Sequence, residues 1–144
     1  MLQKKFIGLI VGGVILLILV LLSFSSYNSL VKKEEKVKLQ WSEVQNTYQR
    51  RLDLIPNLVN VVKGLSDFEQ TTLEKITEAR SKAIAGLSNN ELTGENYQQQ
   101  KKLQDTLAAS ANRIIMRIEK YPTLKGTAAY AGLQTQLEGT ERRI

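Results

Sequence analysis

Two absences limit the chemistry that this 144-residue chain can perform: it has no histidine and no cysteine. It therefore has no imidazole base, no thiolate nucleophile, no disulfide and none of the usual ligands of a zinc or iron–sulfur centre. An enzyme built from this chain would have to use carboxylates, lysine, tyrosine or serine. The composition favours a protein that does not catalyse a reaction.

The few motif-like spacings are weak evidence for a catalytic or metal site. Ser29 and Lys32 have the Ser-x-x-Lys spacing of penicillin-binding enzymes, but the companion motifs are absent, so chance explains the match. Glu34 and Glu35 could bind a hard cation weakly, although a solvated helix face explains them more simply. We expect no catalytic residue, no cofactor and no metal site.

Charged residues also occur where the spacing of apolar residues predicts a buried position. These residues are Arg51 with its neighbour Arg50, Glu69, and Arg80. One explanation is that their long stems cover apolar surface while the charged ends reach water. The other is a buried polar layer in which Glu69 pairs with an arginine and sets the register between helices. The sequence leaves both explanations open.

A polar run around a proline is the candidate interaction site, and it consists of Arg50, Arg51, Asp53, Pro56 and Asn57. Because proline has no backbone N–H, Pro56 marks either a kink or a new helix with Asp53 as its N-cap. These residues either bind a partner protein or only shape the backbone there.

The elements that position these residues begin with an apolar segment. Residues 6–24 read FIGLIVGGVILLILVLLSF and contain no charge. As a helix they would span roughly 28 Å, close to the thickness of the hydrocarbon core of a bilayer. We expect a tail at 1–5 and a transmembrane helix at 6–26. A cleaved signal peptide is the alternative, but this apolar run exceeds the usual ~7–15 residues and no A-x-A site follows it.

Two features of this segment concern its surroundings. Gly8 and Gly12 form a G-x-x-x-G pair that would allow a second helix to approach closely, although chance also produces such pairs. Lysines lie on both sides of the segment, so the charge pattern leaves the side of the membrane undetermined.

Residues 27–144 show helical periodicity, with apolar residues recurring every three or four positions. Such helices must bury their apolar faces against one another, so we expect an all-α, antiparallel bundle of three to four long helices. The first group is Val37, Trp41, Val44, Tyr48, Leu52 and Ile55; the second is Val62, Leu65, Ile76, Ala79 and Ala83; the third is Leu103, Leu107, Ala111, Ile114, Ile118 and Tyr121; the fourth is Tyr130, Leu133, Leu137 and Ile144.

Helix boundaries are indicated at three places. The stretch from Leu87 to Gly94 is rich in turn residues, and Tyr121-Pro122 precedes another break. Ser66 and Glu69 match a capping box with Gly64 as a preceding stop, or they lie inside one long helix.

The net charge of +6 does not indicate nucleic-acid binding, because basic and acidic residues are mixed along the helices. A basic group next to the apolar segment is better placed to meet anionic lipid headgroups. It consists of Lys32, Lys33, Lys36 and Lys38.

Several blocks of the chain follow one another in a specific order. They are Tyr27-Asn28-Ser29-Leu30-Val31, Trp41, RRLDLIPNLVNVVKG at 50–64, Phe68-Glu69, Thr77-Glu78-Ala79-Arg80, Glu119-Lys120-Tyr121-Pro122, Leu133-Gln134 and Leu137-Glu138-Gly139-Thr140-Glu141. Together they resemble the LemA family of bacterial membrane proteins. The resemblance implies a single-pass anchor and an antiparallel helical bundle, but no established catalytic residue, cofactor or substrate.

One departure from the family concerns the end of the chain. Relatives continue with a further helical part and a Phe-Pro end, whereas this sequence stops at Ile144. We therefore expect an incomplete fourth helix, which would expose apolar surface.

These observations favour a non-enzymatic interaction or scaffold protein, anchored by a single pass in the bacterial cell membrane. The expected partners are membrane lipids, unidentified proteins and a second copy of the chain, and not nucleic acid. The alternative is a lipid-binding or membrane-shaping protein that acts through helix dimerisation and the basic group. An enzyme using carboxylates such as Glu69 is a third hypothesis.

Overall fold

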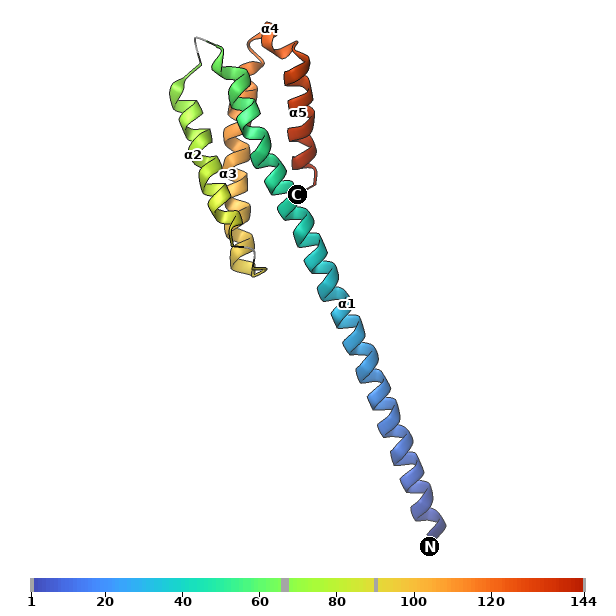
Figure 1. The fold of residues 1–144 in the computed structure, drawn as a ribbon. Helices are drawn as coiled ribbons and strands as arrows, with labels where there is room; N and C mark the ends of the chain where they lie inside the picture. The colour runs from blue at the N-terminus through green and yellow to red at the C-terminus, as the bar shows by residue number, and fades with distance from the viewer. Residues whose placement is uncertain (1, 66–67, 90, 144) are drawn as a thin grey trace. The chain divides into compact units, whose positions relative to one another are not determined.

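The computed structural model describes residues 2–65, 68–89 and 91–143, and these contain five helices and no strand. The predicted all-α fold is thus confirmed (Figure 1). The helices are α1 (Leu2–Lys63), α2 (Gln70–Leu87), α3 (Gly94–Ile118), α4 (Pro122–Lys125) and α5 (Ala128–Glu141). The chain divides into two units, Met1–Gln40 and Trp41–Ile144, and α1 contributes residues to both.

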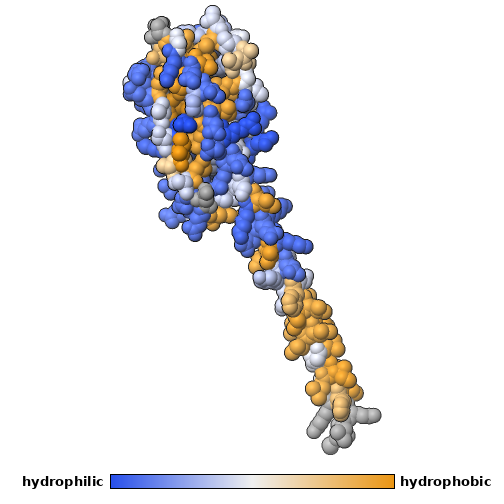
Figure 2. All heavy atoms as spheres, in the orientation of Figure 1, coloured by the Kyte–Doolittle hydropathy of each residue, from blue (hydrophilic) through white to orange (hydrophobic). Residues whose placement is uncertain are grey.

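The first unit contains the apolar segment of α1. Between Phe6 and Phe24 the large apolar side chains are between 43% and 74% exposed, and hydrophobic residues cover most of the face of this segment that Figure 2 shows. Ser23 donates its hydroxyl hydrogen to the Leu19 carbonyl at 2.8 Å, so this side chain is satisfied within the helix. By length and composition alone, this part of α1 could cross a membrane.

The second unit is a bundle formed by the end of α1 with α2, α3 and α5. Successive helices run in opposite directions, and the short α4 connects α3 to α5 (Figure 1). Their apolar faces form one core. The largest fully buried apolar side chains in it are Tyr48, Leu52, Ile55, Leu58, Val62, Ile76, Leu107, Ile114, Ile118 and Tyr130.

The first predicted apolar group lies on α1. The third lies on α3 except for Tyr121, which precedes α4, and the fourth lies on α5 except for Ile144, which is outside the described residues. The second group is divided between two helices. Val62 belongs to α1, whereas Ile76 belongs to α2, because α1 ends at Lys63 and α2 begins at Gln70. The single long helix considered for this stretch is therefore wrong. Glu69 is the N-cap of α2 but makes no side-chain capping bond, and Ser66 of the predicted capping box lies outside the described residues.

Helices α2 and α3 pack closely where a glycine removes a side chain. A Cβ added to Gly86 would lie 2.5 Å from Cδ1 of Leu103, so the leucine packs directly against the α2 backbone. The connection between these helices ends in a cap, since the Thr93 Oγ1 accepts a hydrogen bond from Asn96 N at 3.1 Å. The Leu103 contact holds α2 and α3 side by side, and the cap stabilises the start of α3.

Pro56 lies inside α1, so the predicted new helix start with Asp53 as N-cap is wrong. A proline at this position leaves the Leu52 carbonyl without its usual donor four residues later. Arg80 of α2 supplies the missing donor, because its Nε lies 2.9 Å from the Leu52 oxygen. The α1 helix thus continues through Pro56 while its unpaired carbonyl binds α2.

This arrangement predicts that Arg80 and Pro56 are energetically coupled. Arg80→Met should lower the free energy of unfolding by about 1–3 kcal/mol, because a partly buried carbonyl loses its donor. In a Pro56→Ala background the new N–H can bond to Leu52, so the same substitution should have a smaller effect. Chemical unfolding of the full chain in detergent, followed by Trp41 fluorescence, measures both values, since Trp41 is the single tryptophan and 8% exposed.

Lys75→Met on the exposed face of α2 serves as the control and should change stability little. Equal losses for Arg80→Met in the two backgrounds would contradict the coupling.

Candidate functional site

A buried arginine connects three helices of the bundle. Arg51 of α1 is only 5% exposed. Its Nε donates to Thr140 Oγ1 of α5 at 3.3 Å, and its Nη1 donates to the Gln104 carbonyl of α3 at 3.5 Å. Thr140 in turn donates to the Leu137 carbonyl at 2.7 Å. Arg51 therefore reaches α3 and α5 through neutral oxygen atoms.

The positive charge of Arg51 has no ion-pair partner among the described residues. Burial lowers the pKa of its guanidinium, and the negative charges of Glu141 and Asp105 oppose this effect from a longer distance. An arginine nevertheless remains charged in a protein. The bundle thus contains a buried cation that is balanced only by dipoles and distant charges.

Further polar groups are buried in the same half of the bundle. Gln104 is 2% exposed, and both atoms of its side-chain amide lack a hydrogen-bond partner among the described residues. Gln100 donates to the Asn89 carbonyl at 2.8 Å, but its Oε1 has no partner there either. The hydroxyl of Tyr48 is also unpaired in this part of the chain, and burial raises its pKa.

Gln100, Gln104 and Thr140 are buried, although the spacing of apolar residues did not predict this. A signal was present, because Gln100 and Gln104 precede Leu107 at spacings that continue the third apolar group, and Thr140 follows Leu137 by three. Because glutamine and threonine are mostly exposed in proteins, this spacing did not indicate that the three residues are buried.

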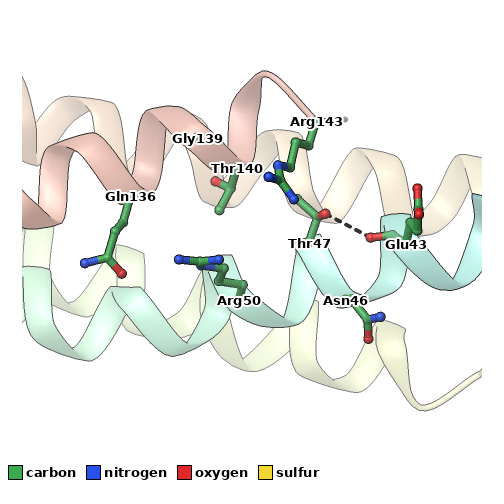
Figure 3. A pocket seen from close by; sticks show the side chains of 8 residues that line it. All are labelled: Glu43, Asn46, Thr47, Arg50, Gln136, Gly139, Thr140 and Arg143. Atoms are coloured by element: carbon green, nitrogen blue, oxygen red, sulfur yellow. Dashed lines mark hydrogen bonds between the residues drawn. The ribbon is translucent and has the colours of Figure 1, made fainter.

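A pocket of about 510 Å³ lies between α1 and α5, and its lining includes Thr140, which Arg51 contacts from the core. In Figure 3 the guanidinium groups of Arg50 and Arg143 extend into the same space beside Thr140, and the amide of Gln136 closes one end. Arg50 and Arg143 form no ion pair with a described residue. The lining residues are Glu43, Asn46, Thr47, Arg50, Gln136, Gly139, Thr140 and Arg143.

The predicted interaction residues separate into two groups. Arg50, Asp53, Pro56 and Asn57 are exposed, whereas Arg51 faces the core. Asp53 accepts a hydrogen bond from Gln49 Nε2 at 2.9 Å. The exposed group forms a polar face on α1 that a partner can reach, and Arg51 is not part of it.

The predicted buried layer is wrong for Glu69. Its carboxylate does pair with an arginine, but the partner is Arg117 of α3 at 3.1 Å, and the two side chains are 60% and 46% exposed. Such an exposed pair contributes little to stability. Arg80 contacts the Leu52 carbonyl instead, so the buried polar contacts involve Arg51 and Arg80 with uncharged oxygens.

Two further expectations concern the glycine pair of the apolar segment and the metal-binding residues. A Cβ added to Gly8 or Gly12 would meet nothing within 4 Å, so this face of α1 is open. Within residues 2–65, 68–89 and 91–143, no group of three or more acidic side chains could hold a metal ion.

Comparison with known proteins gives two matches. The family model described as "LemA family" matches residues 40–144. A relative named Protein LemA, from Metamycoplasma hominis, is 27% identical over 117 residues, which cover 81% of this chain and 50% of that protein. The chain thus spans about half the length of this curated relative.

The burial of Arg51 predicts that a neutral residue at this position stabilises the bundle. Arg51→Met should raise the free energy of unfolding by about 1–3 kcal/mol, because removing an unpaired buried charge outweighs two hydrogen bonds to oxygens. Thr140 keeps its bond to Leu137, so the substitution leaves no unpaired hydroxyl hydrogen. The measurement is denaturant unfolding of the full chain in detergent.

Arg50→Met, at the adjacent exposed position, is the matched control and should change stability by less than about 0.5 kcal/mol. A loss of stability in Arg51→Met would show instead that the arginine holds the three helices together.

Proposed function

Because this chain belongs to the LemA family, we propose that it is a membrane-anchored helical bundle that binds other proteins at the bacterial cell membrane. In this proposal it catalyses no reaction. The observation that carries the proposal is the exposed apolar segment at the start of α1, joined by continuous helix to the first residues of a packed bundle. In this proposal the apolar segment holds the protein at the membrane, and the bundle presents a surface for other proteins to bind.

The apolar segment supports anchoring through its exposure. Its large apolar side chains, from Phe6 to Phe24, are between 43% and 74% exposed. Leaving such side chains in water costs about 25 cal/mol per Å² of apolar surface, and a bilayer removes this cost. A helix also satisfies the backbone hydrogen bonds of this segment within lipid.

The anchor predicts that charges in the middle of the segment release the protein. Ile15→Arg with Leu16→Arg should reduce the carbonate-resistant membrane fraction severalfold, because each arginine opposes insertion by about 2.5–3.5 kcal/mol. Gln40→Arg with Gln98→Arg adds the same charge at exposed positions outside the segment and should have no effect. Release of the parent chain by carbonate, or a mature protein lacking residues 6–24, would contradict the anchor.

The polar face of α1 is the best supported surface for a protein partner. Arg50, Asp53 and Asn57 follow one another at three and four residues, so they lie on one side of the helix, and all three are exposed. Neighbouring charges of opposite sign, with an amide beside them, suit a polar protein surface. The lack of histidine and cysteine supports a binding role over a catalytic one.

This surface predicts a change in cross-linked partners. In native membranes, Arg50→Ala with Asp53→Ala should reduce the recovery of specific cross-linked proteins at least severalfold, as measured by mass spectrometry. Lys101→Ala with Asp105→Ala is the control, because it removes a lysine–aspartate pair from an exposed face of α3. Identical partners and yields for the parent and the first variant would contradict the proposed surface.

A lipid-binding or membrane-shaping role is the second candidate. The open face at Gly8 and Gly12 favours it, because a second copy of the helix can approach there. The basic group gives weaker support, since Lys38 already pairs with Glu34 at 2.7 Å. Cross-linking that captures only further copies of this chain would favour this second role.

A further inference from the structure

We propose that the pocket between α1 and α5 binds a phosphate group, held by Arg50 and Arg143 and supported by the charge of buried Arg51 behind Thr140. This inference goes beyond the proposed function, because the site needs neither the anchor nor a protein partner. All of its residues belong to the second unit of the chain.

The charges around the pocket favour a doubly negative ligand. Arg50 and Arg143 line it, and Arg51 contacts the lining residue Thr140 from the core. Glu43 is the acidic residue of the lining, so the lining has one excess positive charge, and Arg51 raises the excess around the pocket to two. A phosphomonoester carries about −1.5 to −2 at neutral pH, whereas a single carboxylate would neutralise only half of this excess.

Two other acidic groups act on Arg51, and neither fills the pocket. Glu141 and Asp105 raise its pKa through space, but both are exposed on their helices and form no ion pair with it among the described residues. Water therefore screens their charges. In Figure 3 the Glu43 carboxylate lies at the end of the pocket away from Arg50 and Gln136.

The free hydrogen-bond donors also fit a phosphate. Thr47 and Thr140 already donate their hydroxyl hydrogens to the carbonyls of Glu43 and Leu137, at 2.8 Å and 2.7 Å. The remaining donors are the guanidinium groups of Arg50 and Arg143 and the amides of the lining. Guanidinium groups on opposite walls can each bind two phosphate oxygens, which an uncharged ligand cannot match.

The buried residues Arg51 and Gln104, on the core side of Thr140, also favour an anion in the pocket. Arg51 is 5% exposed and lacks a carboxylate partner among the described residues, so its charge lies in a region that water screens weakly. An anion in the adjacent pocket would compensate this charge. Gln104 adds a further unsatisfied polar group to this region. Its backbone carbonyl accepts a hydrogen bond from Arg51, but its side-chain amide has no partner among the described residues.

The phosphate could belong to a soluble metabolite or to a lipid headgroup, because the same arginines would bind a phosphomonoester of either kind. Glycerol 3-phosphate is the soluble probe, and phosphatidic acid carries the same phosphomonoester on a lipid. The first arm titrates glycerol 3-phosphate by calorimetry into the full chain held in phosphatidylcholine nanodiscs. The second arm adds phosphatidic acid to the nanodiscs and repeats the titration.

We expect saturable binding of one glycerol 3-phosphate per chain. Arg50→Gln with Arg143→Gln should weaken it about 10- to 100-fold, because two charged hydrogen-bonding groups are lost. Lys120→Gln with Arg142→Gln removes the same net charge from exposed positions outside the pocket and should change affinity less than about twofold. If phosphatidic acid weakens binding of the probe to the parent chain but not to the Arg50→Gln/Arg143→Gln variant, the lipid headgroup is the source of the phosphate.

A second pair of variants tests the pocket without altering any charge. A Cβ added to Gly139, which lines the pocket, or to Gly132 of the same helix would meet nothing within 4 Å. Gly139→Leu should fill the pocket and weaken binding, whereas Gly132→Leu should leave it unchanged. Circular dichroism confirms that each variant remains helical.

Three results would overturn the proposal: no saturable binding in either arm, an equal loss in the charge control, or full affinity in Gly139→Leu. Because binding is measured on the purified chain, none of these results depends on whether partner proteins are captured in native membranes. The two proposals can therefore fail separately.

Discussion

Burying a positive charge in a helical bundle is unfavourable unless other groups compensate it, and Arg51 imposes this requirement on three helices. Its guanidinium contacts Thr140 on α5 and the Gln104 carbonyl on α3. The arrangement of polar groups between α1, α3 and α5 follows from this contact. The pocket on the other side of Thr140 is lined by Arg50 and Arg143, and Arg51 adds its charge from the core. If the pocket binds a phosphate as proposed, stability and ligand binding make opposite demands on this position.

Arginine acts in the same way at the contact between α1 and α2. Arg80 donates to the Leu52 carbonyl, which Pro56 leaves without a helical donor. In both places an arginine joins two helices through a backbone oxygen instead of a carboxylate. The carboxylates of the bundle remain mostly at its surface, as in the exposed pair of Glu69 with Arg117. Among the described residues, the positive charge of the interior therefore has no carboxylate in direct contact with it, and the α1–α5 pocket opens beside it.

Much of the fold could be predicted from spacing alone. Tyr48, Leu52 and Ile55 are buried as their periodicity indicates, and so are the central residues of α3 and α5. The error occurred where the phase of one helix continued by coincidence into the next, as with Val62 and Ile76. Periodicity records only which face of a helix is apolar, so it could not show that α1 ends at Lys63 and that a new helix begins at Gln70. It also could not assign Glu69 to a surface pair, because the partner lies on a distant segment.

The sequence by itself determined the helical class, the apolar segment, the antiparallel bundle and the absence of imidazole and thiol chemistry. These properties depend on local spacing and composition. Only the tertiary structure decided that Arg51 is buried while Arg50 faces the pocket, and that Arg143 lies across from Arg50 beside Thr140. Adjacent arginines have the same chemistry, and their environments differ because neighbouring helices, distant in sequence, cover one and leave the other in contact with water.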